Sequence, residues 1–281
     1  SEKARAPWRQ GGPQMLESRD LEAPTRHGRV RIRVHRPERG ELPALVYLHG
    51  GGWVVFSVDT HDRVMREYAD RAGCCVVGID YALSPEHRFP VALEQVVDVV
   101  DWLSREGASL GIDGSRLAIG GDSAGANLGV AASLARRDAG KPPLRGMLLN
   151  YGAFVSRCSE DSCRRYGGPG YMLGCEEMTG YWRSYARTEG DLDNPLVCPL
   201  LGELSGLPPA FLAIAECDIL AEQDRQMAER LQAAGVPVQS VVYRGASHSF
   251  IEAMSVAEVS RRALSDASAW LAGVLGRGVM A

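Results

Sequence analysis

The sequence predicts an α/β fold in which a mostly parallel central sheet is flanked by helices on both faces. Strand-like and helix-like segments alternate along the chain, which is typical of such sheets. Several of the strand-like segments are apolar throughout, as in a sheet that is buried on both faces. The chain has 281 residues, 45% of them hydrophobic, so a single domain over residues 1–281 can enclose a large core.

The first half of the chain alternates between the two periodicities. Residues 30–34 alternate apolar and charged side chains, which predicts an edge strand. Helices are predicted over 91–103, where apolar residues recur at helical spacing, and over 124–137, whose small residues allow close packing beneath the sheet. More central strands are predicted at 44–48, 75–79 and 116–119.

The second half contains one long interruption of this pattern. Residues 154–207 show poor strand periodicity and are rich in Tyr, Gly and Cys. A connection of this length inside a compact domain is uncommon unless it is functional. We therefore predict a cap or lid insertion at about 154–207, and we leave open a short N-terminal cap segment over 1–15. The remaining strands are predicted at 148–151, 210–215 and 238–243, and the remaining helices at 220–234 and 257–275.

Composition and charge exclude several classes of partner. The net charge is −4 and the basic residues are dispersed, so neither nucleic acid nor a membrane surface is an expected partner. No apolar run reaches the roughly 18–20 residues of a membrane span. The seven cysteines are an odd number without a C-x-x-C pair, which favours thiols in a reducing cytosol over a disulfide framework. We therefore expect a cytoplasmic protein without a metal site.

The segment Gly121-Asp122-Ser123-Ala124-Gly125 has the G-x-S-x-G pattern of a nucleophile elbow. This pattern places a serine hydroxyl on a sharp turn between a strand and a helix, and a Cβ at either glycine would collide with a neighbouring element. The helix N-terminus behind Ser123 favours a developing negative charge. The alternative is a chance glycine-rich turn, but the apolar strand before it and the small-residue helix after it favour a nucleophile. Asp122 is expected to fix the elbow or to line a substrate pocket.

A glycine run follows the predicted strand over 44–48. Its sequence is His49-Gly50-Gly51-Gly52-Trp53. Glycines leave backbone N–H groups uncovered and allow successive N–H groups to point the same way. We assign an oxyanion hole to the amides of Gly51 and Gly52, joined by the amide of Ala124. The alternative is a plain glycine-rich loop or helix cap. His49 is expected to orient this loop and not to act as a base.

A serine nucleophile needs a base, and the base needs an orienting acid, in the chain order serine, acid, histidine. His248 is the one histidine that follows Ser123, and it comes just after the last predicted strand. The acid is expected after the preceding strand. We favour Asp218 over Glu216, which still belongs to the strand end, and over Asp224, which falls inside the next helix. Structural or surface roles are expected for the other candidates, His27, His35, His61 and His87.

These motifs resemble those of the hormone-sensitive-lipase-like family of α/β-hydrolases, the bacterial carboxylesterases with a GDSAG elbow. The resemblance covers residues 30–271. It includes the segment 80–94, DYALSPEHRFPVALE, and the Leu-Pro-Pro at 207–209. It implies an α/β-hydrolase sheet with a helical cap, and a serine carboxylesterase that hydrolyses short- to medium-chain acyl esters without a cofactor. The family's catalytic serine, acid and histidine fall on Ser123, Asp218 and His248.

The chain departs from the family pattern at two positions next to the site. Ile219 stands where the family usually has proline after the acid, and Ser249 stands where it commonly has glycine after the histidine. Both departures lie beside the catalytic side chains and change neither the acid nor the histidine itself. The expected chemistry is therefore unchanged.

Other functions share parts of this pattern. An arylformamidase or a small-molecule N- or O-deacetylase would use the same triad, although the match to GDSAG and DYALSPEH favours an ester. A non-catalytic ligand-binding homologue would lack the histidine that is present here. An interfacial lipase would need an exposed apolar helix, which the sequence does not show. The expected partner is a small-molecule acyl ester, and a homodimer through an edge strand or the final helix is left open.

Overall fold

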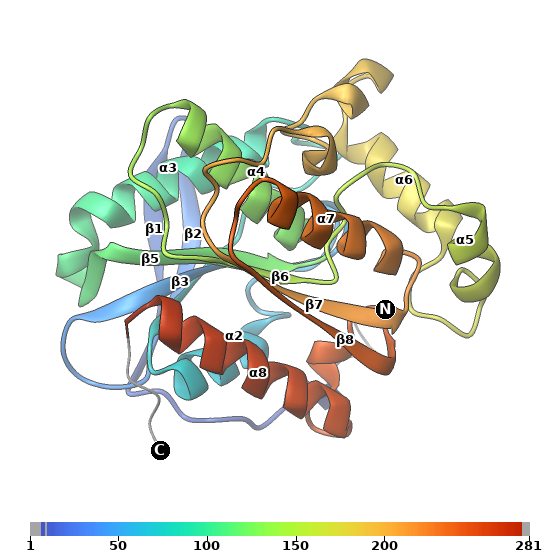
Figure 1. The fold of residues 1–281 in the computed structure, drawn as a ribbon. Helices are drawn as coiled ribbons and strands as arrows, with labels where there is room; N and C mark the ends of the chain where they lie inside the picture. The colour runs from blue at the N-terminus through green and yellow to red at the C-terminus, as the bar shows by residue number, and fades with distance from the viewer. Residues whose placement is uncertain (1–6, 9, 277–281) are drawn as a thin grey trace.

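The computed structural model describes residues 7–8 and 10–276, and its strands form one eight-stranded sheet (Figure 1). The strands are β1 (Glu17–Thr25), β2 (Gly28–Arg36), β3 (Leu42–Leu48), β4 (Cys75–Ile79), β5 (Ile112–Asp122), β6 (Met147–Asn150), β7 (Ala210–Cys217) and β8 (Val238–Ser247). Their order in the sheet is β1-β2-β4-β3-β5-β6-β7-β8. β2 pairs antiparallel with β1 and β4, and the other neighbours are parallel. The predicted mostly parallel sheet is confirmed.

Helices cover both faces of this sheet. They are α2 (Asp62–Ala72), α3 (Val91–Glu106), α4 (Ala124–Asp138), α5 (Glu160–Tyr166), α6 (Cys175–Tyr185), α7 (Ala221–Ala233) and α8 (Glu258–Val274), with the short 3₁₀ helices η1 (Gly107–Leu110), η2 (Glu189–Asp193), η3 (Pro199–Leu201) and η4 (Phe250–Ala253). α3, α4 and α7 lie on one face, and α2 and α8 lie on the other (Figure 1). No helix within the described ranges is long and apolar enough to cross a membrane.

The central strand β3 shows how the sheet divides the core. All seven of its residues are buried, as predicted for a strand covered on both faces. Because successive side chains point to opposite faces, Val46 and Leu48 pack into the apolar cluster that includes α3, α4 and α7. Leu45 and Tyr47 pack into the cluster that includes α2 and α8. The loop after β3 therefore follows a strand that is packed on both faces.

The prediction of an edge strand over 30–34 is wrong, because β1 lies outside β2 at the edge of the sheet. The alternation of charge in β2 has a different cause. The guanidinium groups of Arg31 and Arg33 both pair with Asp20 of β1 and with Asp59. The charged side of β2 is thus covered by ion pairs within the fold.

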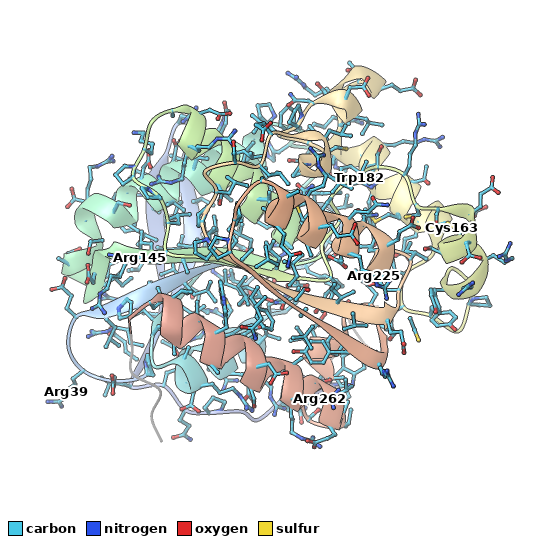
Figure 2. All side chains as sticks on the ribbon, viewed as in Figure 1. Arg39, Arg145, Cys163, Trp182, Arg225 and Arg262 are labelled. Atoms are coloured by element: carbon cyan, nitrogen blue, oxygen red, sulfur yellow. A yellow bond between two sulfur atoms is a disulfide. The ribbon has the colours of Figure 1, made fainter. Side chains whose placement is uncertain are left out.

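The chain between β6 and β7 forms α5, α6, η2 and η3 beside one end of the sheet (Figure 1). Cys163 of α5 and Cys175 at the start of α6 form a disulfide, so the expectation of thiols is wrong for this pair. The other five cysteines form no disulfide within the described part of the chain. Cys163 lies on the outer side of this segment, whereas Trp182 of α6 is buried against the body of the fold (Figure 2).

The N-terminal segment over 1–15, for which a cap role was left open, lies only partly in the described structure. Residues 1–6 and 9 of this segment lie outside the described residues. The carbonyl groups of Gly11 and Pro13 accept hydrogen bonds from Arg66 of α2. This part of the segment is therefore bound to a helix that covers the sheet.

Candidate active site

Ser123 lies on a strained turn between β5 and α4. Its backbone angles are φ +55° and ψ −116°, a conformation that residues other than glycine rarely adopt. A Cβ at Gly121 or at Gly125 would lie 1.9 Å from the carbonyl oxygen of Leu48. The close approach of β3 to this turn therefore requires glycine at both positions. The turn has the sharp strand-to-helix geometry that the G-x-S-x-G pattern predicts.

The Ser123 hydroxyl, the His248 ring and the Asp218 carboxylate form one hydrogen-bonded path. Ser123 Oγ is 3.0 Å from His248 Nε2, and His248 Nδ1 is 2.7 Å from Asp218 Oδ2. Asp218 follows β7 and His248 follows β8, so parallel strands bring both side chains to the same end of the sheet as Ser123. All three side chains are buried.

The hydrogen bonds of Asp218 fix the proton positions on the His248 ring. An ionised carboxylate only accepts hydrogen bonds, so Nδ1 of His248 donates to Asp218. Nε2 is then left to accept the proton of the Ser123 hydroxyl. The second oxygen of Asp218 accepts from the backbone N–H of Leu220 at 3.0 Å, which holds the carboxylate in place.

The two other acid candidates make different contacts. Glu216 accepts a hydrogen bond from the backbone N–H of Gly245. Asp224 is fully buried in α7, where it accepts from the backbone N–H of Gly152 at 2.8 Å. Burial, and then the nearby charge of Asp218, raise the pKa of Asp224 well above its usual value. A carboxyl group that stays neutral is a poor partner for a histidine that must become charged.

The HGGGW loop faces the same space as Ser123. Gly51 and Gly52 have φ values of +109° and +58°, which glycine adopts without strain. The amides of Gly51 and Gly52 donate no hydrogen bond to any part of the chain that the structure describes. Ala124 is the first residue of α4, so its amide has no partner within the helix. These N–H groups are available to an incoming oxygen atom.

Asp122 joins this loop to the elbow. Its Oδ1 accepts from the Tyr47 hydroxyl at 2.7 Å and from the Gly50 N–H at 3.2 Å. Burial alone would raise the pKa of Asp122, but the neighbouring His61 and the Tyr47 hydroxyl hold it below its usual value. Asp122 therefore fixes the elbow and also borders the cavity beside Ser123. The sequence predicts only a structural or surface role for His61 and does not mark Tyr47, because nothing in the local pattern identifies a buried partner from a distant strand or loop.

His49 is held in an orienting position. Its Nδ1 is 2.7 Å from the carbonyl oxygen of Gly50, and its ring stacks on Tyr81 with centroids 4.3 Å apart. The Tyr81 hydroxyl donates to the carbonyl oxygen of His49. Burial, and then the nearby His61, lower the pKa of His49 to about 3, so its ring is neutral. The remaining histidines are dispersed: His27 contacts Glu94, His35 contacts Ser18, and His87 is exposed.

A small cavity of about 70 Å³ opens beside Ser123. α6 and the turn before it form one wall with apolar side chains and one acid. The lining residues are Gly51, Gly52, Phe56, Asp122, Ser123, Met172, Leu173, Glu177, Met178, Tyr181, His248 and Ser249. The arrangement brings a serine hydroxyl, a histidine ring and uncovered backbone amides around one space, and acyl transfer requires groups of these kinds.

Known proteins share this sequence over most of its length. Residues 45–252 match a family of proteins that have the α/β-hydrolase fold. The chain is 38% identical over 248 residues to the ethyl acetate hydrolase of Pseudomonas putida, a match that covers 85% of this chain and 77% of that protein. It is 35% identical over 265 residues to the acetyl esterase of Salmonella agona, covering 92% of this chain and 80% of that one.

Solved structures share the fold closely. A hyperthermophilic esterase from the archaeon Pyrobaculum calidifontis superimposes with a TM-score of 0.93 at 36% identity, covering 97% of this chain and 88% of that one. A thermostable carboxylesterase cloned from a metagenomic library has a TM-score of 0.93 at 30% identity, covering 98% of this chain and 95% of that one.

The fold, the motifs and these matches define the class of protein. The chain belongs to the α/β-hydrolases, in the hormone-sensitive-lipase-like family that its motifs resemble. Within that family it is a carboxylic ester hydrolase that acts on small esters. The fold class, the family and the enzyme class predicted from the sequence are therefore confirmed.

Proposed function

We propose that the enzyme is a serine carboxylesterase in which Ser123 is the nucleophile, His248 the general base and Asp218 the acid that orients it. The observation that carries this proposal is the continuous hydrogen-bonded path from Ser123 Oγ through the His248 ring to Asp218. Such a path activates a hydroxyl near neutral pH, because the proton passes to the histidine while the oxygen attacks.

The reaction has two matching halves. Ser123 Oγ forms a bond to the ester carbonyl carbon, and its proton moves to Nε2 of His248. The bond to the alcohol oxygen then breaks, and Nε2 donates the proton to the leaving alcohol. A water molecule attacks the acyl-enzyme in the same way and releases the carboxylic acid. Asp218 stabilises the imidazolium form of His248 in both halves.

The negative charge that develops on the carbonyl oxygen is held by the amides of Gly51, Gly52 and Ala124. The uncovered N–H groups of the HGGGW loop and the first turn of α4 support this assignment. Removing one donor of this kind typically lowers turnover by about 10²–10³-fold. Because these donors belong to the backbone, their placement depends on the glycines and on the loop's contact with Asp122.

The substrate is a small-molecule ester with a short acyl chain. The cavity of about 70 Å³ beside Ser123 supports an acyl group of a few atoms, such as acetyl. The two relatives described above are named ethyl acetate hydrolase and acetyl esterase, and both names refer to esters of acetic acid. The segment over 154–207 acts as a cap, because Met178 and Tyr181 of α6 close the cavity on one side.

A p-nitrophenyl ester series from acetate to dodecanoate tests this proposal. We expect hydrolysis of the acetate and butyrate, a decline through medium chains, and loss of turnover in Ser123→Ala. Ser133→Ala is a matched control, because Ser133 is a buried serine of α4 whose hydroxyl donates to the Gly129 carbonyl within that helix. Retained activity in Ser123→Ala would contradict the proposal.

The arylformamidase and deacetylase alternatives predict a different preference. They require faster turnover of N-formylkynurenine or of an acetylated amine than of an aryl acetate by the wild-type enzyme. We expect the aryl acetate to be the better substrate, because the relatives with the same fold are esterases.

A further inference from the structure

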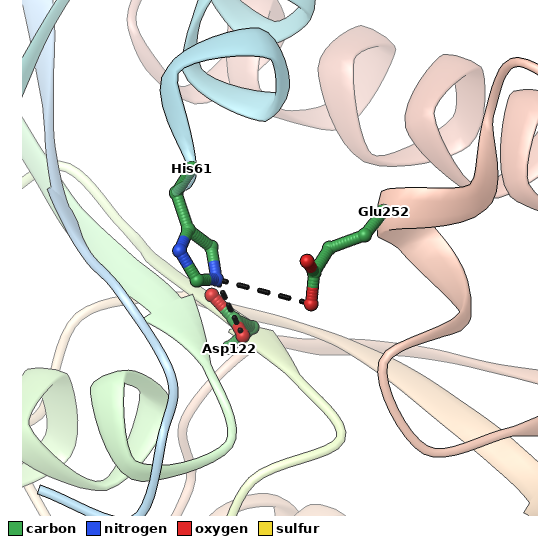
Figure 3. Close-up of side chains that lie close together, drawn as sticks. All are labelled: His61, Asp122 and Glu252. Atoms are coloured by element: carbon green, nitrogen blue, oxygen red, sulfur yellow. Dashed lines mark ion pairs between the residues drawn. The ribbon is translucent and has the colours of Figure 1, made fainter. Parts of the chain in front are cut away.

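His61 lies where the segment before α2, the end of β5 and the 3₁₀ helix η4 meet (Figure 3). It directly precedes α2 and is 1% exposed. Its Nε2 is 3.4 Å from Oδ2 of Asp122, the residue before Ser123. The same atom is 3.9 Å from Oε1 of Glu252, which belongs to η4, just after His248. Both carboxyl groups are buried.

The Thr60 hydroxyl contacts Nδ1 of His61, and the direction of this hydrogen bond depends on the ring's tautomer. The hydroxyl has a single proton, and its oxygen lies 2.7 Å from the carbonyl oxygen of Ser57. The same hydroxyl oxygen accepts from the Ser57 N–H at 3.0 Å. His61 Nδ1 lies 2.8 Å from this hydroxyl oxygen, and the Ser57 carbonyl also accepts from the Thr60 N–H at 3.1 Å. Nδ1 donates to Thr60 when it carries a proton, and it accepts from the Thr60 hydroxyl when it does not.

In either arrangement Nε2 faces Asp122 and Glu252. A neutral ring with its proton on Nδ1 would direct the Nε2 lone pair at two buried carboxyl groups, and a neutral ring with its proton on Nε2 would leave their charge unbalanced, so both neutral forms cost free energy. A second proton makes the ring an imidazolium and balances negative charge that burial separates from water. The hydrogen bonds that Asp122 Oδ1 accepts from the Tyr47 hydroxyl and the Gly50 N–H favour the ionised form of this carboxyl group.

We propose that His61 is a positively charged positioning residue. It fixes the relative positions of the HGGGW loop over residues 49–53 (the oxyanion loop), the turn that carries Ser123 and the loop that carries His248. It acts through Asp122 on Gly50 and Ser123, and through Glu252 on the loop that carries His248. This inference rests on the proposed function of Ser123 and His248. His61 itself does not touch the substrate.

The other titratable groups around His61 do not replace this charge. The His49 ring lies 5.7 Å away between centroids and is neutral, and the Tyr47 ring lies 6.4 Å away. Asp62 follows His61 at the start of α2 but is paired with Arg33 and Arg66. The buried His35 also contacts Asp62, with its Nε2 3.4 Å from Asp62 Oδ1. Asp122 and Glu252 thus remain the two acids that face Nε2.

The direct test is the protonation state of the His61 ring in the wild-type enzyme, measured by nitrogen-15 NMR with assignment by His61→Gln. We expect protons on both ring nitrogens at pH 7. Glu252→Gln removes one acid and should shift the loss of the second proton to lower pH. A singly protonated ring at pH 7 in the wild-type enzyme would overturn the proposal.

Kinetics supply the second test. In His61→Gln we expect kcat for p-nitrophenyl acetate to fall by on the order of 10–100-fold with little change in KM, because the amides and the nucleophile are misaligned. Wild-type kcat should also fall as pH rises through the pKa of His61, and Glu252→Gln should move this fall to lower pH. His35→Gln is the control, because His35 is equally buried near α2 but contacts Ser18 and Asp62. Unchanged kcat in folded His61→Gln would overturn the proposal.

Two further measurements separate the alternatives. A bound cation could occupy the position of the Nε2 proton, because histidine nitrogen and carboxylate oxygen are common ligands. One equivalent of zinc by elemental analysis, together with a singly protonated ring, would overturn the proposal in favour of a metal site. Failure of the proposed function would instead appear as retained activity in Ser123→Ala, whatever the state of His61.

Discussion

The ring of Tyr181 occupies the space that a side chain at position 52 would need. A Cβ built on Gly52 would lie 2.2 Å from Cγ of Tyr181. The oxyanion loop and α6 are therefore in direct contact, and the segment between β6 and β7 limits where the Gly52 amide can lie. Tyr181 also donates from its hydroxyl to Glu177 one turn earlier, which fixes the ring over the loop.

Gly52→Ala should lower kcat by on the order of 10²-fold, the cost of losing one oxyanion donor. The methyl group would displace either Tyr181 or the loop, and φ of +58° is strained for alanine. The double variant Gly52→Ala with Tyr181→Ala should recover part of this loss, because the collision is relieved while the backbone strain remains. Turnover of p-nitrophenyl acetate measures both. Equal activity of the single and double variants would show that the contact with Tyr181 does not position the loop.

Ser249→Gly should raise the free energy of unfolding by about 0.5–1 kcal/mol. Ser249 has φ of +63°, a left-handed conformation that costs non-glycine residues about 1–2 kcal/mol. Glycine removes this cost, but its greater conformational freedom in the unfolded chain offsets part of the stabilisation. Chemical denaturation gives the value. Ser255→Gly, at an exposed turn position without a positive φ, is the control and should be destabilising. A loss of stability in Ser249→Gly would contradict this account.

Asp224→Asn should make stability less dependent on pH. The pKa of Asp224 is raised by burial, so the folded protein binds more protons than the unfolded chain above pH 3.8. Its contribution to the free energy of unfolding therefore falls as pH rises from that value towards the folded pKa. An asparagine oxygen can still accept from the Gly152 N–H without this loss.

Denaturation of wild type and Asp224→Asn between pH 5 and pH 8 measures the difference. The advantage of the variant should grow with pH, and Asp70→Asn at an exposed position is the control. Asp224→Asn should also keep its esterase activity, whereas Asp218→Asn should lose it. A variant that loses activity at position 224 and keeps it at position 218 would reverse the assignment of the acid.

Cys163→Ser should destabilise the segment between β6 and β7. The disulfide to Cys175 closes a short loop, and a cross-link of this size contributes about 2–3 kcal/mol in the chain-entropy description. We expect faster cleavage between α5 and α6 in limited proteolysis, with the sheet domain intact. Cys158→Ser, at a cysteine outside the disulfide, is the control. A non-reduced peptide map without the 163–175 linkage would contradict the disulfide itself.

The strands that position the site could be predicted because the sheet is buried on both faces. Segments that are apolar throughout, such as β3 and β4, are typical of central strands. The glycines at 121 and 125 are required by the close approach of Leu48. Sequence reasoning missed β1 and α2. β1 is an edge strand with mostly half-exposed or exposed side chains, so it lacks an apolar pattern.

Other features depend on contacts that no local pattern records. The Cys163–Cys175 pairing follows from how α5 and α6 fold against each other, and cysteine spacing alone does not determine a pairing. The role of His61 depends on Asp122 and Glu252, which lie on distant segments and meet it only in the folded chain. Chain order sufficed to predict that Ser123, Asp218 and His248 lie together, because each follows a parallel strand at the same end of the sheet.

The central claim is that Ser123 is the nucleophile activated by His248. Labelling the folded enzyme with a fluorophosphonate and mapping the adduct by peptide mass spectrometry tests it most directly. We predict one covalent adduct, on the peptide that contains Ser123, with labelling strongly slowed in His248→Ala. An adduct on another residue, or labelling of the wild-type enzyme that does not depend on His248, would contradict the account.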